Sequence, residues 1–147
     1  MNDILIQLAT AFLGSLAFSV VFGVSFRRLI PASLGGLAGW VIYLLIFHWL
    51  HSEFAACLIA SAFAALYGEV LARILKAPAT IFFVPAVIPL IPGSSLYYTM
   101  SCAMQGDWLG FQQYGFLTGQ FALGIAAGIS LVWALSSMLR TCQHHSI

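Results

Sequence analysis

Long apolar runs, separated by short groups of charged or polar residues, cover almost the whole of this chain. The runs lie at about 4–24, 34–50, 54–75, 79–105 and 108–139. A helix needs about 20 apolar residues to cross the ~30 Å core of a bilayer. The pattern therefore predicts an all-α integral membrane protein. Residues 1–147 would form a single transmembrane domain, a bundle of five transmembrane helices whose fourth member is broken by proline and glycine.

The fourth run cannot form one continuous helix, because it contains four of the five prolines of the chain. They are Pro78, Pro85, Pro89 and Pro92. A proline inside a helix lacks an N–H and clashes with the carbonyl four residues earlier. Gly93 follows directly and offers a flexible joint, and Ser94 and Ser95 stand where an N-cap would begin a second helix. We predict a helix, a break and a second helix.

A broken helix inside a membrane has two interpretations. Freed backbone groups persist at membrane depth only where they are buried in protein or line a cavity, and transporters bind substrates at such breaks. At 1.5 Å per residue from Thr80, Pro89 lies about 14 Å and Gly93 about 20 Å into the bilayer, near its middle. The alternative is a kinked packing helix, since proline is frequent in membrane helices.

On the first interpretation, the start of the second helix binds a carboxylate. A helix N-terminus presents free N–H groups and the positive end of its dipole. Tyr97 and Tyr98 add hydroxyl groups nearby, although both also suit packing or an interfacial position. The candidate substrate-binding residues are Pro89, Pro92, Gly93, Ser94, Ser95 and Tyr97.

Composition excludes several classes of protein. The chain is 62% hydrophobic and 6% charged, against about 25% charged in soluble domains, so no soluble domain fits. A net charge of +1 argues against a nucleic-acid partner. So small a bundle needs copies of itself or a second protein to enclose a transport path. Small residues four apart would form the helix contacts: Gly35/Gly39, Ala56/Ala60/Ala64, Gly115/Gly119 and Gly124/Gly128.

Basic residues predict the orientation, because loops rich in Lys and Arg stay in the cytoplasm. If the broken segment crosses once, all five basic residues lie inside: Arg27, Arg28, Arg73, Lys76 and Arg140. Asp3, Glu53 and Asp107 then lie outside. Arg27-Arg28 and Pro31 are expected to form the first loop. We predict five crossings, with the N-terminus outside and the C-terminus cytoplasmic. A re-entrant segment would move Arg140 outside.

Glu69, Arg73 and Lys76 are spaced to share one face of the third helix. Counted from Phe54, Glu69 lies about 22 Å and Arg73 about 28 Å along it. The pair is either an anchor at the cytoplasmic edge, where such side chains snorkel, or a coupling or gating group at the inner mouth of a pathway.

No metal site, cofactor or enzyme activity is predicted. His48 and His51 lack a dependable third ligand, and His144-His145 carries no specific signal. The three cysteines have no metal-binding spacing. The serines lack a neighbouring base for nucleophilic catalysis.

The central third of the chain contains the run Ile88-Pro89-Leu90-Ile91-Pro92-Gly93, followed by Tyr97 and Met100. In this run the chain resembles the threonine/serine exporter family. Glu69-x-x-x-Arg73 and Lys76-x-Pro78 also fit the family pattern. The chain is similar to the smaller membrane domain of that family, which occurs fused behind a larger domain or as a separate subunit beside a larger partner.

The resemblance implies export of small carboxylate-bearing metabolites across the bacterial inner membrane. The expected substrates are threonine and serine, or succinate-type dicarboxylates in some split pairs, with export driven by an ion gradient. The expected partner is a larger membrane subunit of the same family. The alternative is a scaffold that stabilises a larger transporter without transporting, and the broken fourth helix favours transport.

Overall fold

The computed structural model of the protein describes the backbone of residues 2–144 and the side chains of residues 4–138. His145 and the side chains of Asp3, Arg140 and His144, which entered the sequence-based predictions, lie outside it. The elements are α1 (Asn2–Val21), α2 (Phe26–Leu50), α3 (Glu53–Leu75), α4 (Thr80–Val87), the 3-10 turn η1 (Ile88–Leu90), α5 (Gly93–Gln105) and α6 (Trp108–His144).

The prediction of an all-α membrane bundle is confirmed. The four helices α1, α2, α3 and α6 are long and apolar enough to cross a membrane. The segment of α4 and η1 and the helix α5 form a pair bent by 54°, which supplies a fifth span if it crosses as one unit. The described residues contain no strand. The predicted helix, break and helix are therefore present in the fourth apolar run.

The prediction that Arg27, Arg28 and Pro31 form a loop is wrong, because α2 already begins at Phe26. Pro31 lies in the second turn, so the hydrogen bond that it removes is one near the start of the helix. Two contacts hold this turn in place. An Arg28 Nη donates to the carbonyl of Leu75 over 3.2 Å, and the hydroxyl of Tyr67 donates to the carbonyl of Pro31 over 2.6 Å.

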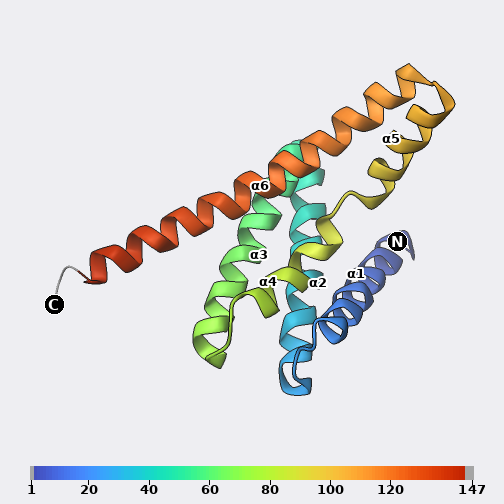
Figure 1. Ribbon diagram of the computed structural model, residues 1–147. Coiled ribbons are helices and arrows are strands. Elements are labelled where there is room, and N and C mark those ends of the chain that lie inside the picture. Colours follow the sequence, from blue (N-terminus) through green and yellow to red (C-terminus); the bar gives the residue numbers. More distant parts are fainter. Residues whose placement is uncertain (1, 145–147) are drawn as a thin grey trace.

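The helices form an open arrangement in which α6 runs obliquely across the others (Figure 1). The α1–α2 and α3–α4 connections lie at one end, which we call the basic end because it carries Arg27, Arg28, Arg73 and Lys76. The α2–α3 turn at His51 lies at the opposite end. The helix α5 packs along α6 and projects with it away from the other helices.

The short helix α4 lies in a groove between α2 and α3. Phe82, Pro85 and Ala86 are buried there. Gly68 of α3 makes room for it, because a Cβ on Gly68 would come within 2.8 Å of the Cβ of Phe83. The first half of the broken span is therefore enclosed by protein, as its freed backbone groups require.

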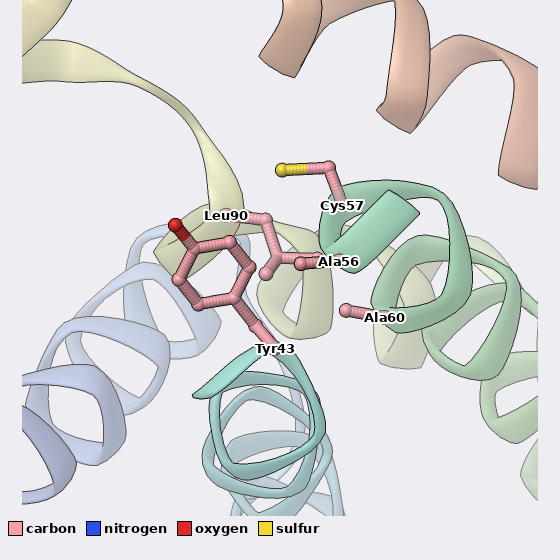
Figure 2. Packing of buried hydrophobic residues seen from close by; sticks show 5 residues of the cluster. All are labelled: Tyr43, Ala56, Cys57, Ala60 and Leu90. Atoms are coloured by element: carbon pink, nitrogen blue, oxygen red, sulfur yellow. The ribbon is translucent and has the colours of Figure 1, made fainter. Parts of the chain in front are cut away.

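A cluster of buried side chains holds η1 against α2 and α3. It consists of Tyr43, Ala56, Cys57, Ala60 and Leu90. Figure 2 shows the side chain of Leu90 beside Ala56 and the ring of Tyr43. The Tyr43 hydroxyl donates to a carboxylate oxygen of Glu53 over 2.5 Å, which fixes the ring at the end of the bundle away from the basic residues.

The predicted close packing of small residues is present where α3 meets α6. Ala56, Ala60 and Ala64 are fully buried. A Cβ on Gly124 would meet the carbonyl of Phe54 at 2.8 Å, so α6 approaches the backbone of α3 closely. Gly119, by contrast, faces open space. Close approach is thus confined to part of the small-residue pattern.

Candidate functional site

The chain leaves helical geometry for only two residues at the break. Ile91 is extended, and Pro92 has φ −78° and ψ 62°, the geometry of an inverse γ-turn. The matching hydrogen bond is present, because the N–H of Gly93 donates to the carbonyl of Ile91 over 2.8 Å. The N–H of Ile91 in turn donates to Ile88 over 3.2 Å. This tight turn restarts the helix at Gly93.

The prediction that Ser94 or Ser95 caps the second helix is wrong. The cap position is Pro92, and no side chain caps it. The hydroxyl of Ser95 instead donates to the carbonyl of Pro92 over 3.3 Å. The N–H of Gly93 is used in the turn, so the N–H groups without an intrahelical acceptor are those of Ser94 and Ser95. Gly93 has no left-handed backbone, and a Cβ there would meet nothing within 4 Å.

The prolines free carbonyl groups on the face of α4 that meets α2. Pro89 has no N–H, so the carbonyl of Pro85 has lost its helical donor. The glycines of α2 face this surface. A Cβ on Gly36 would lie 3.1 Å from the carbonyl oxygen of Pro85, and one on Gly39 would lie 3.4 Å from that of Ala86. The glycines thus let the broken backbone pack directly against α2.

Two buried polar atoms lie along the same seam between α1, α2 and the break. They are the hydroxyl of Ser15 and the indole N–H of Trp40. Neither has a hydrogen-bond partner among the described residues. Sequence analysis gave neither residue a functional role; Ser15 was expected only as a small residue for close helix contact. The one signal in the sequence was Trp40 itself, because it lies within an apolar run and tryptophan is expected mainly at the membrane interfaces.

A cavity of about 200 Å³ opens beside Trp40. Its lining is Gln7, Thr10, Ala11, Trp40 and Pro89. Pro89 is therefore the one predicted substrate-binding residue that lines this cavity. Polar side chains from α1 and α2 meet the broken segment here, in a helix pair that is otherwise largely apolar.

The other predicted substrate-binding residues are not gathered in one pocket. Pro92 is partly buried at the joint, while Gly93 and Ser94 are exposed beside it. Ser95 is buried in the α5–α6 contact, where the hydroxyls of Thr99 and Thr118 lie 3.4 Å apart. The ring of Tyr97 is 68% exposed. The two halves of the motif thus face different surroundings.

Glu69 and Arg73 form the expected ion pair, with an N–O distance of 2.9 Å. The Glu69 side chain is 10% exposed and that of Arg73 62%, so the carboxylate is enclosed and the guanidinium reaches outward. Lys76 does not share their helical face. It ends α3 in the left-handed region, with φ 46°, and its N–H donates to the carbonyl of Ala72.

The carboxylate of Glu69 borders a cavity of about 320 Å³ between α3, α4 and α6. The lining is Ala65, Glu69, Ala79, Thr80, Phe83, Trp133, Ser136 and Ser137. The cavity lies toward the basic end and reaches the start of the broken span. A charged group and three hydroxyls therefore meet where α4 begins.

His48 and His51 are exposed, with ring centroids 6.5 Å apart. Among the described residues, no three potential metal-ligating side chains come together. The two histidines lie at the end of α2 near Trp49, in keeping with an interfacial position.

The family model described as Threonine/Serine exporter, ThrE, matches residues 7–135 of the chain. The match includes the broken span, the cavity beside Trp40, the Glu69–Arg73 pair and the lining of the cavity at Glu69 except for Ser136 and Ser137. No solved structure matches the chain.

Proposed function

This chain belongs to the threonine/serine exporter family, and from that premise we propose that it is the small subunit of a two-component exporter. Its partner is a larger membrane subunit of the same family. The cargo is a small carboxylate metabolite, either threonine and serine or a succinate-type dicarboxylate, and an ion gradient drives its export. The observation that carries the proposal is the break at residues 88–93, which follows directly on a helix, α4, whose Pro85 and Ala86 pack against glycines of α2.

A larger partner is supported by how little of this chain is buried. The helices α1 and α6 bury only 11% of their apolar windows. The side-chain amides of Gln113 and Gln120, seven residues apart on α6, have no hydrogen-bond partner among the described residues. An amide in lipid is costly without a partner, and glutamine side chains form hydrogen bonds between membrane helices. A second protein along α6 would satisfy them.

Coupling is assigned to Glu69 and Arg73. A carboxylate within a membrane span is expensive and marks an ion or substrate pathway by default. Glu69 is buried, pairs with an exposed Arg73 and borders the cavity at the start of α4. Protonation or a change of partner at Glu69 would alter the packing between α3 and the first half of the broken span. The pair would thus act as a gate.

In this proposal the joint carries the substrate past the middle of the bilayer. Gly93 and Ser94 are exposed at the joint, Pro92 is partly buried there, and Pro89 lines the cavity beside Trp40. Ser95 and Tyr97 support the joint from α5. The proposed orientation places the basic end in the cytoplasm of the bacterial inner membrane, following the positive-inside rule.

The test is export from cells. Labelled threonine and labelled succinate are loaded into cells that express this chain alone, its larger partner alone, both, or neither. Export should require both proteins and follow the imposed ion gradient. Full export with the larger protein alone would reject the transport role.

The second candidate function is a scaffold that only stabilises the larger subunit, which the close small-residue contacts of α3 and α6 also suit. A scaffold predicts that Pro92→Ala, which heals the break, leaves export per assembled complex unchanged. A transport subunit predicts a loss of export at equal assembly. Co-purification with the partner gives the amount of complex needed for the comparison.

A further inference from the structure

We infer that the seam where Gln7, Thr10 and Trp40 meet Pro89 is a binding site for the carboxylate and ammonium groups of a small zwitterion. The inference rests on the proposed export function and names the place where this chain would hold its substrate. It moves the site from the start of α5 to the cavity that Pro89 shares with α1 and α2, where Gln7 and Thr10 are exposed and the indole N–H of Trp40 is buried.

The seam is built in two layers one helical turn apart. Residues four apart on a helix lie above one another. The lower layer joins Ser15, Gly36 and the carbonyl of Pro85. The next turn of each of the three segments brings Ala11, Trp40 and Pro89 to the cavity. The broken backbone therefore borders α1 and α2 over two consecutive turns.

Each layer contains a buried polar atom without a partner. The hydroxyl of Ser15 is fully buried, and the indole N–H of Trp40 is buried beside the cavity. Among the described side chains these are the two buried polar atoms that lack a hydrogen bond. A buried donor left without an acceptor is destabilising, and such groups call for an explanation such as an absent ligand or water. Both lie on one seam.

The cavity offers a donor and acceptors in a complementary set. Trp40 can only donate. The Thr10 hydroxyl donates to the carbonyls of its own helix at 2.9 Å, so toward the cavity its oxygen accepts. Gln7 can do both through its amide. A carboxylate would accept from Trp40 and Gln7, and an ammonium would donate to Thr10 and to the Gln7 oxygen.

The charge of the lining selects the class of ligand. No Lys, Arg, Asp or Glu lines this cavity, so a ligand with a net charge of −2 would lack a counter-ion in a membrane. A zwitterion carries its own balancing charge. The volume of about 200 Å³ compares with ~30 Å³ for one water molecule, which is room for a small metabolite. The neighbouring groove between α1 and α2 is lined by Leu, Ile, Val and Phe apart from His48 and His51 at the end of α2, so α1 contributes no polar group to it.

The experiment uses inside-out membrane vesicles from cells that express the chain together with its larger partner. Uptake of labelled threonine, measured per assembled complex, gives the half-saturating concentration. Trp40→Phe removes the indole N–H and keeps an aromatic ring at the position where Trp40 stacks on Tyr43, with ring centroids 4.9 Å apart. Gln7→Leu removes the amide. Each should raise the half-saturating concentration about tenfold, as expected for losing a hydrogen bond to a charged group, with little change in maximal rate.

Matched controls are Trp49→Phe and Gln105→Leu. Trp49 is 81% exposed at the far end of α2, and Gln105 is exposed at the end of α5. Both should leave the half-saturating concentration unchanged.

Three results would count against the inference. Unchanged half-saturating concentrations for both Trp40→Phe and Gln7→Leu, with the parent complex active, would remove the seam from substrate binding and leave the proposed export function intact. A parent complex that transports neither labelled threonine nor labelled succinate would overturn the proposed function itself, and the inference with it. If Trp40→Phe and Gln7→Leu weaken succinate transport as much as threonine transport, the seam holds a carboxylate but does not select a zwitterion.

Discussion

Gly36 of α2 lies directly against the side chain of Ser15 of α1. A Cβ on Gly36 would overlap the Ser15 hydroxyl and come within 2.7 Å of the Ser15 Cβ. The same Cβ would lie 3.1 Å from the carbonyl oxygen of Pro85. Three segments far apart in the sequence therefore meet at one glycine, and the fit of α1 to the broken span depends on its lack of a side chain.

Gly36→Ala should destabilise the protein by about 1–3 kcal/mol, the usual effect of overpacking a close contact. Ser15→Gly in the same chain should recover much of this loss, because it removes both Ser15 atoms that the new methyl group would meet. Thermal unfolding in detergent of the two single variants and the double variant measures the coupling. If the stability changes of the two single variants simply add up in the double variant, α1 does not pack on Gly36.

The control for this cycle is Gly119→Ala in α6. Nothing lies within 4 Å of a Cβ at Gly119, so this variant should be neutral or slightly stabilising through helix propensity, by at most about 1 kcal/mol. A loss as large as that of Gly36→Ala would indicate a general intolerance of the chain to added methyl groups.

Gly93→Leu should leave the amount and folding of this chain unchanged. The residue has ordinary helical backbone and open space around it, so neither strain nor a clash is expected. Export per assembled complex should fall at least tenfold, because the side chain would cover the exposed joint that the proposed function places on the substrate path. Gly14→Leu, which also enters open space, is the control. Normal export by Gly93→Leu would remove the joint from the pathway.

Glu69→Gln separates an anchoring role from a gating role. Because Arg73 is 62% exposed, solvent screens the pair, and its loss should change stability by no more than about 1 kcal/mol. A gate predicts a far larger effect, a loss of at least tenfold in gradient-driven export per complex. Asp107→Asn is the control, since Asp107 caps the start of α6 by accepting from the N–H of Gly110 at 3.1 Å. Small and similar losses of export in Glu69→Gln and Asp107→Asn would favour the anchoring role.

Cysteine labelling decides whether the bent pair crosses the membrane. The segment from Thr80 to Leu90 and the 13 residues of α5 measure about 16 Å and 20 Å at helical rise, enough for one crossing in spite of the 54° bend. In a cysteine-free background, Phe26→Cys and Pro78→Cys should react from the cytoplasm and Met104→Cys from outside. All three residues are exposed. Reaction of Met104→Cys from the cytoplasm would mean a re-entrant segment.

The sequence by itself determined the helical, membrane-embedded class and the position of the break. Both follow from local chemistry. Continuous apolar runs are stable in lipid only as helices or closed barrels, and prolines at positions 85, 89 and 92 remove hydrogen bonds wherever the chain lies. The pairing of Glu69 with Arg73 is equally local, because residues four apart on a helix are neighbours.

The residues at which helices begin could not be predicted from the local sequence pattern alone. Arg27, Arg28 and Pro31 were assigned to a loop because a charged pair and a proline usually mark one. In the structure Leu75 and Tyr67 of α3 supply partners for this turn, and the helix extends through it. Ser94 and Ser95 failed as caps because the γ-turn at Pro92 starts the helix at Gly93, so that the cap lies two residues before Ser94.

The tertiary structure alone decided which side of the break faces polar groups. Gln7, Thr10 and Ser15 lie in the first apolar run, about 75 residues before Pro85 and Pro89, and no local pattern connects them. They meet because Gly36 lets α1 and the broken span approach α2 from two sides. Which side chains share a cavity depends on how closely whole helices can pack, and that is a property of the assembled bundle.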